Sequence, residues 1–377
     1  MTRSPVRCLE LADWLRCERV TRVAMEATSD YWKPVFYLLE AEGFDCWLLN
    51  AKHVKHLPGR PKTDKLDAVW LAKVVERGMC APSLVHPAPI RRLRDLTRYR
   101  RSLIRDRTRE RQRLEKLLED AQIKLSSVIS DILGVSGRAM LEALIAGQRN
   151  PKALAQLART NMRTKIDVLT EALTGHFTDH HAFLTRTMID RIDAITTTIE
   201  QVSAAIAEQI APFRDHAERL DEITGIGVRS AEELIAEIGV DMTRFPTAAH
   251  LVSWAKFAPI DKQSAGSKKP GSTGTGNPWI AGTLGEVVAG LSRTHTFLGQ
   301  RYRQLARRRG KRRAIVALGN SLLTIIWHLL ADPEARYHDL GADHYHSRIT
   351  AHRRRRTLIR ELEHLTGHKV TLQPQAA

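Results

Sequence analysis

The chain has 377 residues, and its 59 lysines and arginines outnumber its 42 aspartates and glutamates, giving a formal net charge of +17. A pI near 10.1 disfavours an acidic small-molecule enzyme and favours a polyanionic partner, either nucleic acid or a membrane surface. The longest apolar candidate, Ala314 to Leu330, contains a glycine and polar residues. It therefore falls short of the roughly 18 uninterrupted apolar residues of a membrane span, and the N-terminus has no signal-peptide core. Nucleic acid is the expected partner.

The cysteine pattern indicates a reducing compartment. The four cysteines are widely spaced and form no Cys-x-x-Cys pair. This pattern is typical of reduced, partly buried thiols and gives no sign of a metal site. We therefore expect a cytoplasmic protein.

Residues 1–90 alternate between helical and strand patterns. In chain order we predict a helix, a strand, a helix, a strand and a helix, at residues 9–16, 20–25, 31–42, 44–49 and 63–77. This order predicts a mostly parallel sheet covered by helices, and therefore an α/β fold for residues 1–90.

A long helix is predicted from residue 90 to about 122, where leucines recur at helical spacing. Eleven arginines lie between Arg91 and Arg113, against three acidic residues. A solvated helix face is one interpretation, and a surface that follows a nucleic-acid backbone is the one we favour. The candidate phosphate-binding residues are Arg91, Arg92, Arg94, Arg98, Arg100, Arg101 and Arg105.

The rest of the chain is predicted to be helical. Isoleucines on one side of residues 188–210 are typical of a coiled-coil arm. A second globular unit follows, and then a basic tail with four consecutive arginines, Arg353–Arg356, that we expect to be solvated. We therefore divide the chain into four parts, at residues 1–90, 91–215, 216–330 and 331–377.

Three acidic residues could form a metal site. Glu26 follows the first predicted strand, while Asp64 and Asp67 share one face of a helix because they lie three positions apart. Together they would suit Mg²⁺, and two ions roughly 4 Å apart can clamp the attacking and leaving oxygens of a phosphodiester. The alternative is ordinary chemistry at a helix start, with Thr63 or Asp64 as the N-cap.

Two further segments could contact DNA. In the turn Ile223–Gly227, Gly225 and Gly227 resemble a helix–hairpin–helix whose backbone N–H groups approach a phosphate, although a plain turn between two helices fits equally. The loop 261–277 is either a flexible linker or a mobile basic loop. In the second case Ser264 could attack a DNA phosphate beside Lys268 and Lys269.

Several segments of the chain resemble the IS110 family of transposases in order and spacing. In the first 100 residues they are Ala24–Trp32, Asn50–Val54, Lys62–Ala68 and Leu93–Arg100. Farther along they are Ile223–Gly227, Leu251–Trp254 and Gln263–Lys268. The resemblance extends to about residue 330, and motifs in a fixed order are more specific than any one of them.

The resemblance implies a RuvC-like, ribonuclease H-type domain, a coiled-coil segment and a mainly helical transposase domain. It assigns Glu26, Asp64 and Asp67 to an Asp-Glu-Asp-Asp magnesium site, and Ser264 to the nucleophile that links covalently to DNA. It further implies that the partners are element ends and target DNA, that a structured guide RNA can take part, and that the protein is a homo-oligomer associated with the bacterial nucleoid.

One feature departs from the family pattern. The family's first aspartate lies on an opening strand, whereas only 25 residues precede Glu26 here, and Asp13 lies on a predicted helix. We therefore expect a truncated RuvC-like domain whose metal site is one ligand short. Two functions stay open: DNA recombination through Ser264, and a catalytically inactive remnant that only binds nucleic acid.

Overall fold

The structure is a computed structural model that describes residues 5–60, 63–260, 262–264, 266–269 and 271–371. For Pro5, Lys262, Ser264, Lys268, Lys269 and residues 345–352 it describes the backbone alone. The chain divides into two units, Met1–Pro87 (unit 1) and Ala88–Ala377 (unit 2).

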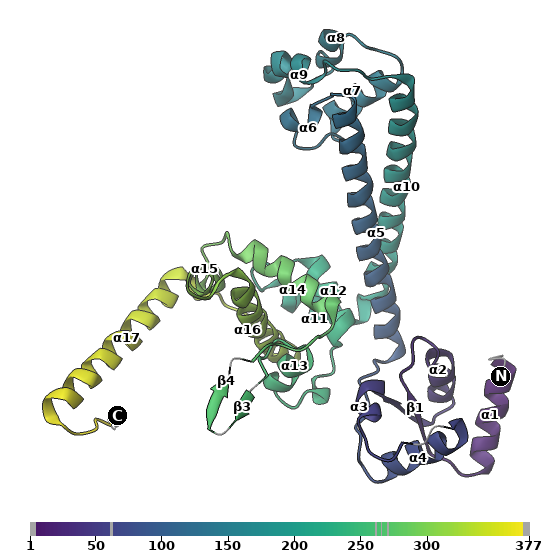
Figure 1. Cartoon of the computed structure of the whole chain (residues 1–377), viewed down its shortest axis with the longest axis vertical. Helices are drawn as coiled ribbons and strands as arrows, with labels where there is room; N and C mark the ends of the chain where they lie inside the picture. The colour runs from purple at the N-terminus through teal and green to yellow at the C-terminus, as the bar shows by residue number, and fades with distance from the viewer. Residues whose placement is uncertain (1–4, 61–62, 261, 265, 270, 372–377) are drawn as a thin grey trace. The chain divides into compact units, whose positions relative to one another are not determined.

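Unit 1 contains two strands among short helices (Figure 1). Its elements are α1 (Pro5–Cys17), β1 (Arg22–Glu26), α2 (Lys33–Ala41), β2 (Asp45–Leu49), α3 (Ala51–Lys55) and α4 (Asp64–Glu76). The five predicted elements are present, with ends shifted by a few residues, and the parallel pairing of β1 with β2 is confirmed. The short helix α3 was not predicted.

The sheet of unit 1 is covered on both faces. Val23 and Met25 of β1 pack in a cluster with α1 and α2, whereas Ala24 packs in a second cluster with α3 and α4. This division follows the two-residue period of a strand. Glu26 therefore stands at the carboxyl end of a parallel strand, where α/β sheets place their ligands.

Unit 2 is almost entirely helical in its described residues. Its elements are α5 (Ala88–Asp120), α6 (Leu125–Val128), α7 (Val135–Ile145), α8 (Pro151–Ala155), η1 (Thr160–Lys165), α9 (Ile166–Ala172), α10 (Asp179–Gln209), η2 (Ala211–Phe213), α11 (Arg214–Asp221), α12 (Val228–Ile238), η3 (Met242–Arg244), α13 (Ala248–Trp254), β3 (Lys262–Ser264), β4 (Ser267–Lys269), α14 (Pro278–Leu291), α15 (Phe297–Arg309), α16 (Lys311–Ala331) and α17 (Gly341–Thr366).

Helices α5 and α10 lie side by side over most of their length (Figure 1). Helix α5 ends just before Gln122, which adopts a left-handed conformation with φ 60°. Near this end, Leu114 and Leu118 of α5 share a core with α6–α9 and with Ile189 and Ile192 of α10. The predicted long helix is therefore present, and the predicted arm helix begins nine residues earlier than expected, at Asp179.

Helix α16 is the centre of the next helical group. It is long and apolar enough to cross a membrane by length and composition alone, and the described residues contain one such helix. Leu318, Leu322 and Ile326 are nevertheless fully buried, and α16 packs against α11, α13, α14 and α15. The packing is that of a core helix.

Two segments of unit 2 contain elements that were not predicted individually. Arg353–Arg356 lie within α17, and their exposed side chains agree with the expected solvated tail. The loop 261–277, for which a flexible linker and a mobile basic loop were both open, contains the antiparallel hairpin β3–β4. The composition of the two segments did not indicate a helix or a hairpin, since arginine runs and Gly/Ser runs are more common in irregular segments.

Candidate functional site

The hairpin β3–β4 carries the predicted nucleophile. In its antiparallel register Ser264 pairs with Ser267, Gln263 with Lys268 and Lys262 with Lys269. Gly266 in the turn has φ +77°, a conformation that costs other residues strain. The backbone therefore places Ser264 at the tip of the hairpin. The side chains of Ser264, Lys268 and Lys269 lie outside the described part of the chain.

The two chain segments that flank the hairpin are held together. The Ile260 N–H donates to the Ser272 carbonyl oxygen at 3.1 Å. A Cβ atom on Gly271 would lie 1.8 Å from the Ile260 oxygen, and one on Gly276 would lie 2.5 Å from the Ala255 oxygen. Only glycine allows two backbones to approach this closely. The glycines of this loop thus give close packing, which explains a composition that otherwise indicates a flexible linker.

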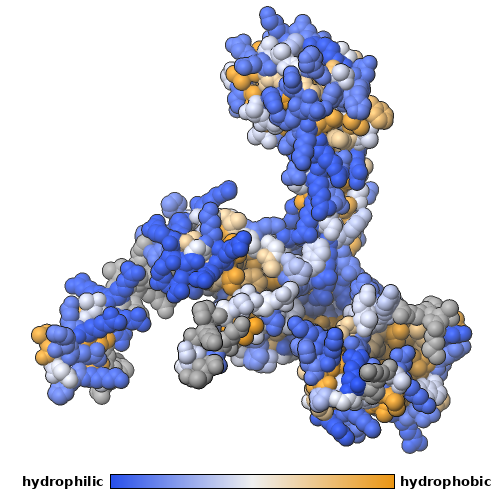
Figure 2. Space-filling model, in the orientation of Figure 1, coloured by the Kyte–Doolittle hydropathy of each residue, from blue (hydrophilic) through white to orange (hydrophobic). Residues whose placement is uncertain are grey.

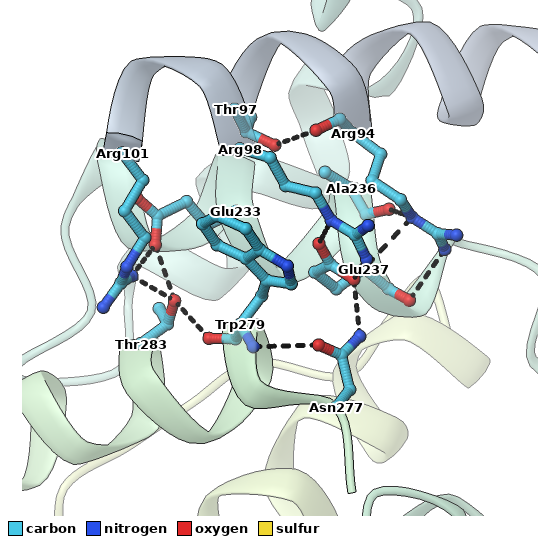
Figure 3. Close-up of polar contacts among 10 residues, drawn as sticks. All are labelled: Arg94, Thr97, Arg98, Arg101, Glu233, Ala236, Glu237, Asn277, Trp279 and Thr283. Carbon is cyan, nitrogen blue, oxygen red and sulfur yellow. Dashed lines mark hydrogen bonds and ion pairs between the residues drawn. The ribbon is translucent and has the colours of Figure 1, made fainter. Parts of the chain in front are cut away.

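The loop ends at Asn277, which is anchored twice. Its side-chain oxygen accepts from the Trp279 N–H at 2.9 Å and so caps α14. Its Nδ2 donates to Glu237 Oε2 on α12 at 2.6 Å (Figure 3). Glu237 in turn accepts two hydrogen bonds from Arg98 of α5, at 2.7 and 2.9 Å. The loop 261–277 is therefore anchored at its end to the Arg98–Glu237 ion pair between α5 and α12.

Arginines of α5 form further buried pairs beside this anchor. Arg101 Nη1 donates to Glu233 Oε2 at 2.5 Å and to Thr283 Oγ1 at 2.8 Å, and Arg101 also pairs with Glu286. Arg100 Nη2 lies 2.7 Å from Glu232 Oε2, in an ion pair that lacks hydrogen-bond geometry. The side chains of Arg100, Arg101, Glu232 and Glu233 are each less than a tenth exposed. Such pairs persist because either charge alone would be costly to bury.

Arg94 has a similar structural role. Its guanidinium donates to the Ala236 and Glu237 carbonyl oxygens at 3.0 and 3.2 Å. These oxygens belong to the last turn of α12, where a cation stabilises the helix end. We call the contacts of Arg94, Arg98, Arg100 and Arg101 with α12 and α14 the arginine platform. Figure 3 shows Arg94, Arg98 and Arg101.

The arginine platform corrects the prediction for these four arginines. We expected them on a surface that follows a nucleic-acid backbone, but their guanidinium groups face carboxylates and carbonyl oxygens within the protein. The glutamates of α12 that neutralise them lie more than 130 residues later in the chain. Among the other candidates, Arg92 and Arg105 are exposed and Arg91 is half-buried.

The turn between α11 and α12 exposes both of its predicted glycines. Gly225 has φ +92°, and a Cβ atom there would meet the Leu291 side chain at 3.0 Å, whereas Gly227 begins α12. Ile223 and Ile226 are buried beneath them. Close packing on α14 therefore explains why a glycine stands at position 225. A contact between the exposed backbone of this turn and a phosphate stays a prediction.

In unit 1 an arginine joins two of the three predicted acidic residues. Arg60 Nη2 lies 2.7 Å from Glu26 Oε2 and 2.9 Å from Asp67 Oδ2, and Arg60 Nε donates to Asp67 Oδ1 at 2.9 Å. The hydrogen bonds to Asp67 and then Glu26 raise the pKa of Arg60 above its already high usual value. Asp64 is exposed at the start of α4.

This arrangement does not match the expected magnesium site. The described residues contain no group of three metal-ligating side chains. Glu26 and Asp67 are brought together, as predicted, but a guanidinium lies where a cation shared by both carboxylates would lie. Arg60 was not among the residues predicted for this site.

A basic corner between α15 and α16 was also missed at the level of sequence. It contains Arg307, Arg308, Arg309, Lys311, Arg312 and Arg313, all exposed. Six basic residues within seven positions were a visible signal, but the segment was interpreted only as part of a globular unit.

Two sequence models of transposase families match the chain. The DEDD transposase domain of the IS110 type, described as a transposase, matches residues 1–123, and the transposase IS116/IS110/IS902 family matches residues 217–304. A curated relative, the insertion element IS900 uncharacterized 42 kDa protein of Mycobacterium paratuberculosis, is 29% identical over 328 residues, which cover 80% of each chain. The insertion element IS110 uncharacterized 43.6 kDa protein of Streptomyces coelicolor is 41% identical over 76 residues, 20% of this chain and 18% of that protein.

These matches include both the acidic residues of unit 1 and the serine hairpin of unit 2. They define a transposase, a class of enzyme that cuts DNA. The chain belongs to the IS110 family of insertion-element transposases.

Proposed function

We propose that this chain cuts and rejoins DNA by phosphoryl transfer through Ser264. The observation that supports the proposal is the anchored position of the hairpin β3–β4. Ser264 lies at its tip, and the flanking segments are fixed by the Ile260–Ser272 hydrogen bond and by Asn277. A nucleophile in a fixed position reacts faster, because part of the entropic cost of alignment is met in advance.

The reaction conserves phosphodiester bonds. The Ser264 hydroxyl oxygen attacks a DNA phosphorus atom, a P–O bond to the serine forms, and the P–O bond to one deoxyribose oxygen breaks. The serine proton is lost to a base or solvent, and the departing oxygen takes up a proton. A hydroxyl of another DNA end then attacks the same phosphorus and releases the serine. We assign to Lys268 and Lys269 the stabilisation of charge on the pentavalent phosphorus.

We further propose that unit 1 is the RuvC-like domain of the family, with Glu26, Asp64 and Asp67 as its acidic residues. Magnesium at these residues would supply electrostatic stabilisation of a scissile phosphate. As the described residues stand, the ion would have to compete with Arg60 for Glu26 and Asp67, while Asp64 is exposed.

The remaining assignments concern partners and organisation. We propose that DNA backbone contacts Arg92, Arg105 and the exposed turn at Gly225 and Gly227. In the proposed organisation, residues 91–215 form a coiled-coil arm, 216–330 the transposase domain and 331–377 a basic C-terminal part. A guide RNA, a homo-oligomer and a cytoplasmic, nucleoid-associated location follow from family membership as further proposals.

A non-catalytic nucleic-acid-binding protein is the second candidate function. The observation that favours it is the pairing of Glu26 and Asp67 with Arg60, which gives unit 1 no ready acidic site. This candidate predicts salt-sensitive DNA binding without any covalent intermediate.

A suicide substrate separates the two functions. A nicked element-end DNA, in which the leaving strand diffuses away, should trap a covalent adduct with the full-length chain. Ser264→Ala should abolish the adduct, while Ser267→Ala, the matched change at the paired hairpin position, should retain it. DNA binding without an adduct in the unsubstituted chain would support the non-catalytic candidate, and an adduct that persists in Ser264→Ala would contradict the serine assignment.

A further inference from the structure

Exposed cations gather at the basic corner between α15 and α16. We define it by its six cations, Arg307–Arg309 at the end of α15 and Lys311–Arg313 at the start of α16. Within the part of the chain that the structure describes, none of the six makes an ion pair. The corner therefore differs from the arginine platform, whose cations are matched by glutamates.

Local stability does not explain these charges. Arginines at the end of α15 agree with the helix dipole, but the three cations that begin α16 lie at the positive end of its dipole, where they are unfavourable. They also repel one another across Gly310, whose φ is +84°. A bound anion would relieve both effects, because a helix N-terminus and guanidinium groups each favour negative charge.

The corner opens onto a cavity of about 620 Å³. Arg309, Arg312 and Arg313 line it, together with Arg301 of α15. Around the corner and α15 the surface in view is largely hydrophilic (Figure 2). The cavity thus joins four guanidinium groups from two helices in one space.

The same cavity reaches the base of the serine hairpin. Pro259, before β3, and Gly271, Ser272 and Thr273, after β4, line it together with the arginines. These residues include the Ser272 carbonyl group that bonds to Ile260. Helix α16 also fixes this side, since Asn320 Nδ2 donates to the Phe257 carbonyl oxygen at 3.2 Å.

We propose that this cavity binds the phosphate backbone of the DNA strand on which the serine hairpin acts. Its ligand is a run of phosphodiesters, held by Arg301, Arg309, Arg312 and Arg313. Guanidinium groups suit this ligand because each can donate two parallel hydrogen bonds to phosphate oxygens. The inference rests on the proposed function for its choice of DNA, while the site itself rests on the charges and the cavity.

The test measures DNA binding in the Ser264→Ala background, where no covalent step contributes. The triple change Arg309→Gln, Arg312→Gln and Arg313→Gln is compared with Arg353→Gln, Arg354→Gln and Arg355→Gln on α17. Both remove three exposed positive charges. Each lost phosphate contact lowers the slope of log K against log salt by about 0.7 for single strands and 0.9 for duplex DNA. We expect the corner variant to lose about 2 to 3 from this slope, and the α17 variant to lose clearly less.

Circular dichroism should stay unchanged in both variants, and the unfolding midpoint should fall in neither, since the altered side chains are exposed and those at the start of α16 oppose its dipole. An equal loss of slope in the two variants would overturn the site, because net charge alone would then explain binding. A corner variant that folds and keeps the full salt slope would also overturn the site. Loss of RNA binding with DNA binding retained would overturn it too. None of these outcomes bears on the Ser264 adduct, so the two proposals fail separately.

Discussion

Replacing Arg101 by methionine tests whether the arginine platform is structural. Arg101 and its partner Glu233 have side chains only 8% and 9% exposed. Loss of one member of a buried pair costs about 3–5 kcal/mol, because the other charge stays buried without compensation. Thr283 still donates to Glu233, so we expect the lower end, about 3 kcal/mol.

Urea unfolding of the full chain, followed by circular dichroism, measures this change. Arg105→Met is the matched control one helical turn along, because Arg105 is exposed and contacts the Trp279 ring at 5.3 Å. Loss of such a cation–π contact should cost about 1 kcal/mol or less. The double variant Arg101→Met with Glu233→Met should regain most of the lost stability, since it removes both buried charges.

DNA affinity decides between the structural role and the role first predicted. If the platform is structural, the folded double variant binds DNA with an unchanged salt dependence. An Arg101→Met variant that keeps full stability but loses DNA affinity and salt slope would refute the structural role of Arg101. Arg101 would then be a phosphate contact.

Three other predictions concern single residues. Gly271→Ala should prevent the approach of its backbone to the Ile260 oxygen and sharply reduce Ser264-dependent adduct formation with helix content retained; an unchanged adduct yield would show that this approach is dispensable. Arg60→Gln should strengthen Mg²⁺ binding measured by calorimetry, because it removes the cation between the two carboxylates; weaker binding would contradict this competition. Burial raises the pKa of the Cys46 thiol to about 11, so at pH 8 its thiolate fraction falls by roughly two orders of magnitude, and iodoacetamide should label the exposed Cys17 much faster; equal rates in mass spectrometry would contradict the burial.

Local patterns predicted the elements of this chain well. The strand–helix–strand–helix order of residues 1–90 and the long helix α5 depend on hydrophobic periods within one segment. Glu26 and Asp67 were assigned to one site from a strand end and a helix face, and both contact Arg60, while their role as metal ligands stays a prediction.

What the sequence could not predict were contacts between distant segments. The pairing of Arg98 with Glu237 joins residues 139 positions apart, so a charge run on one helix was mistaken for a surface. The loop 261–277 has the glycine and serine content of a linker. Gly271 is required because its backbone approaches the Ile260 oxygen, and this approach is visible only in the structure. The basic corner was visible as a pattern, but its position beside the hairpin depends on the packing of α15 and α16.

The most direct test of the central claim is to locate the protein atom that is joined to DNA. After a suicide substrate is trapped and nuclease has trimmed the DNA, trypsin cuts after Lys262 and Lys268 and releases the peptide Gln263–Lys268. Fragmentation in the mass spectrometer then distinguishes Ser264 from Ser267. We expect a nucleotide phosphate on Ser264. A modification on Ser267 or on any other residue, or DNA binding with no modified peptide, would contradict it.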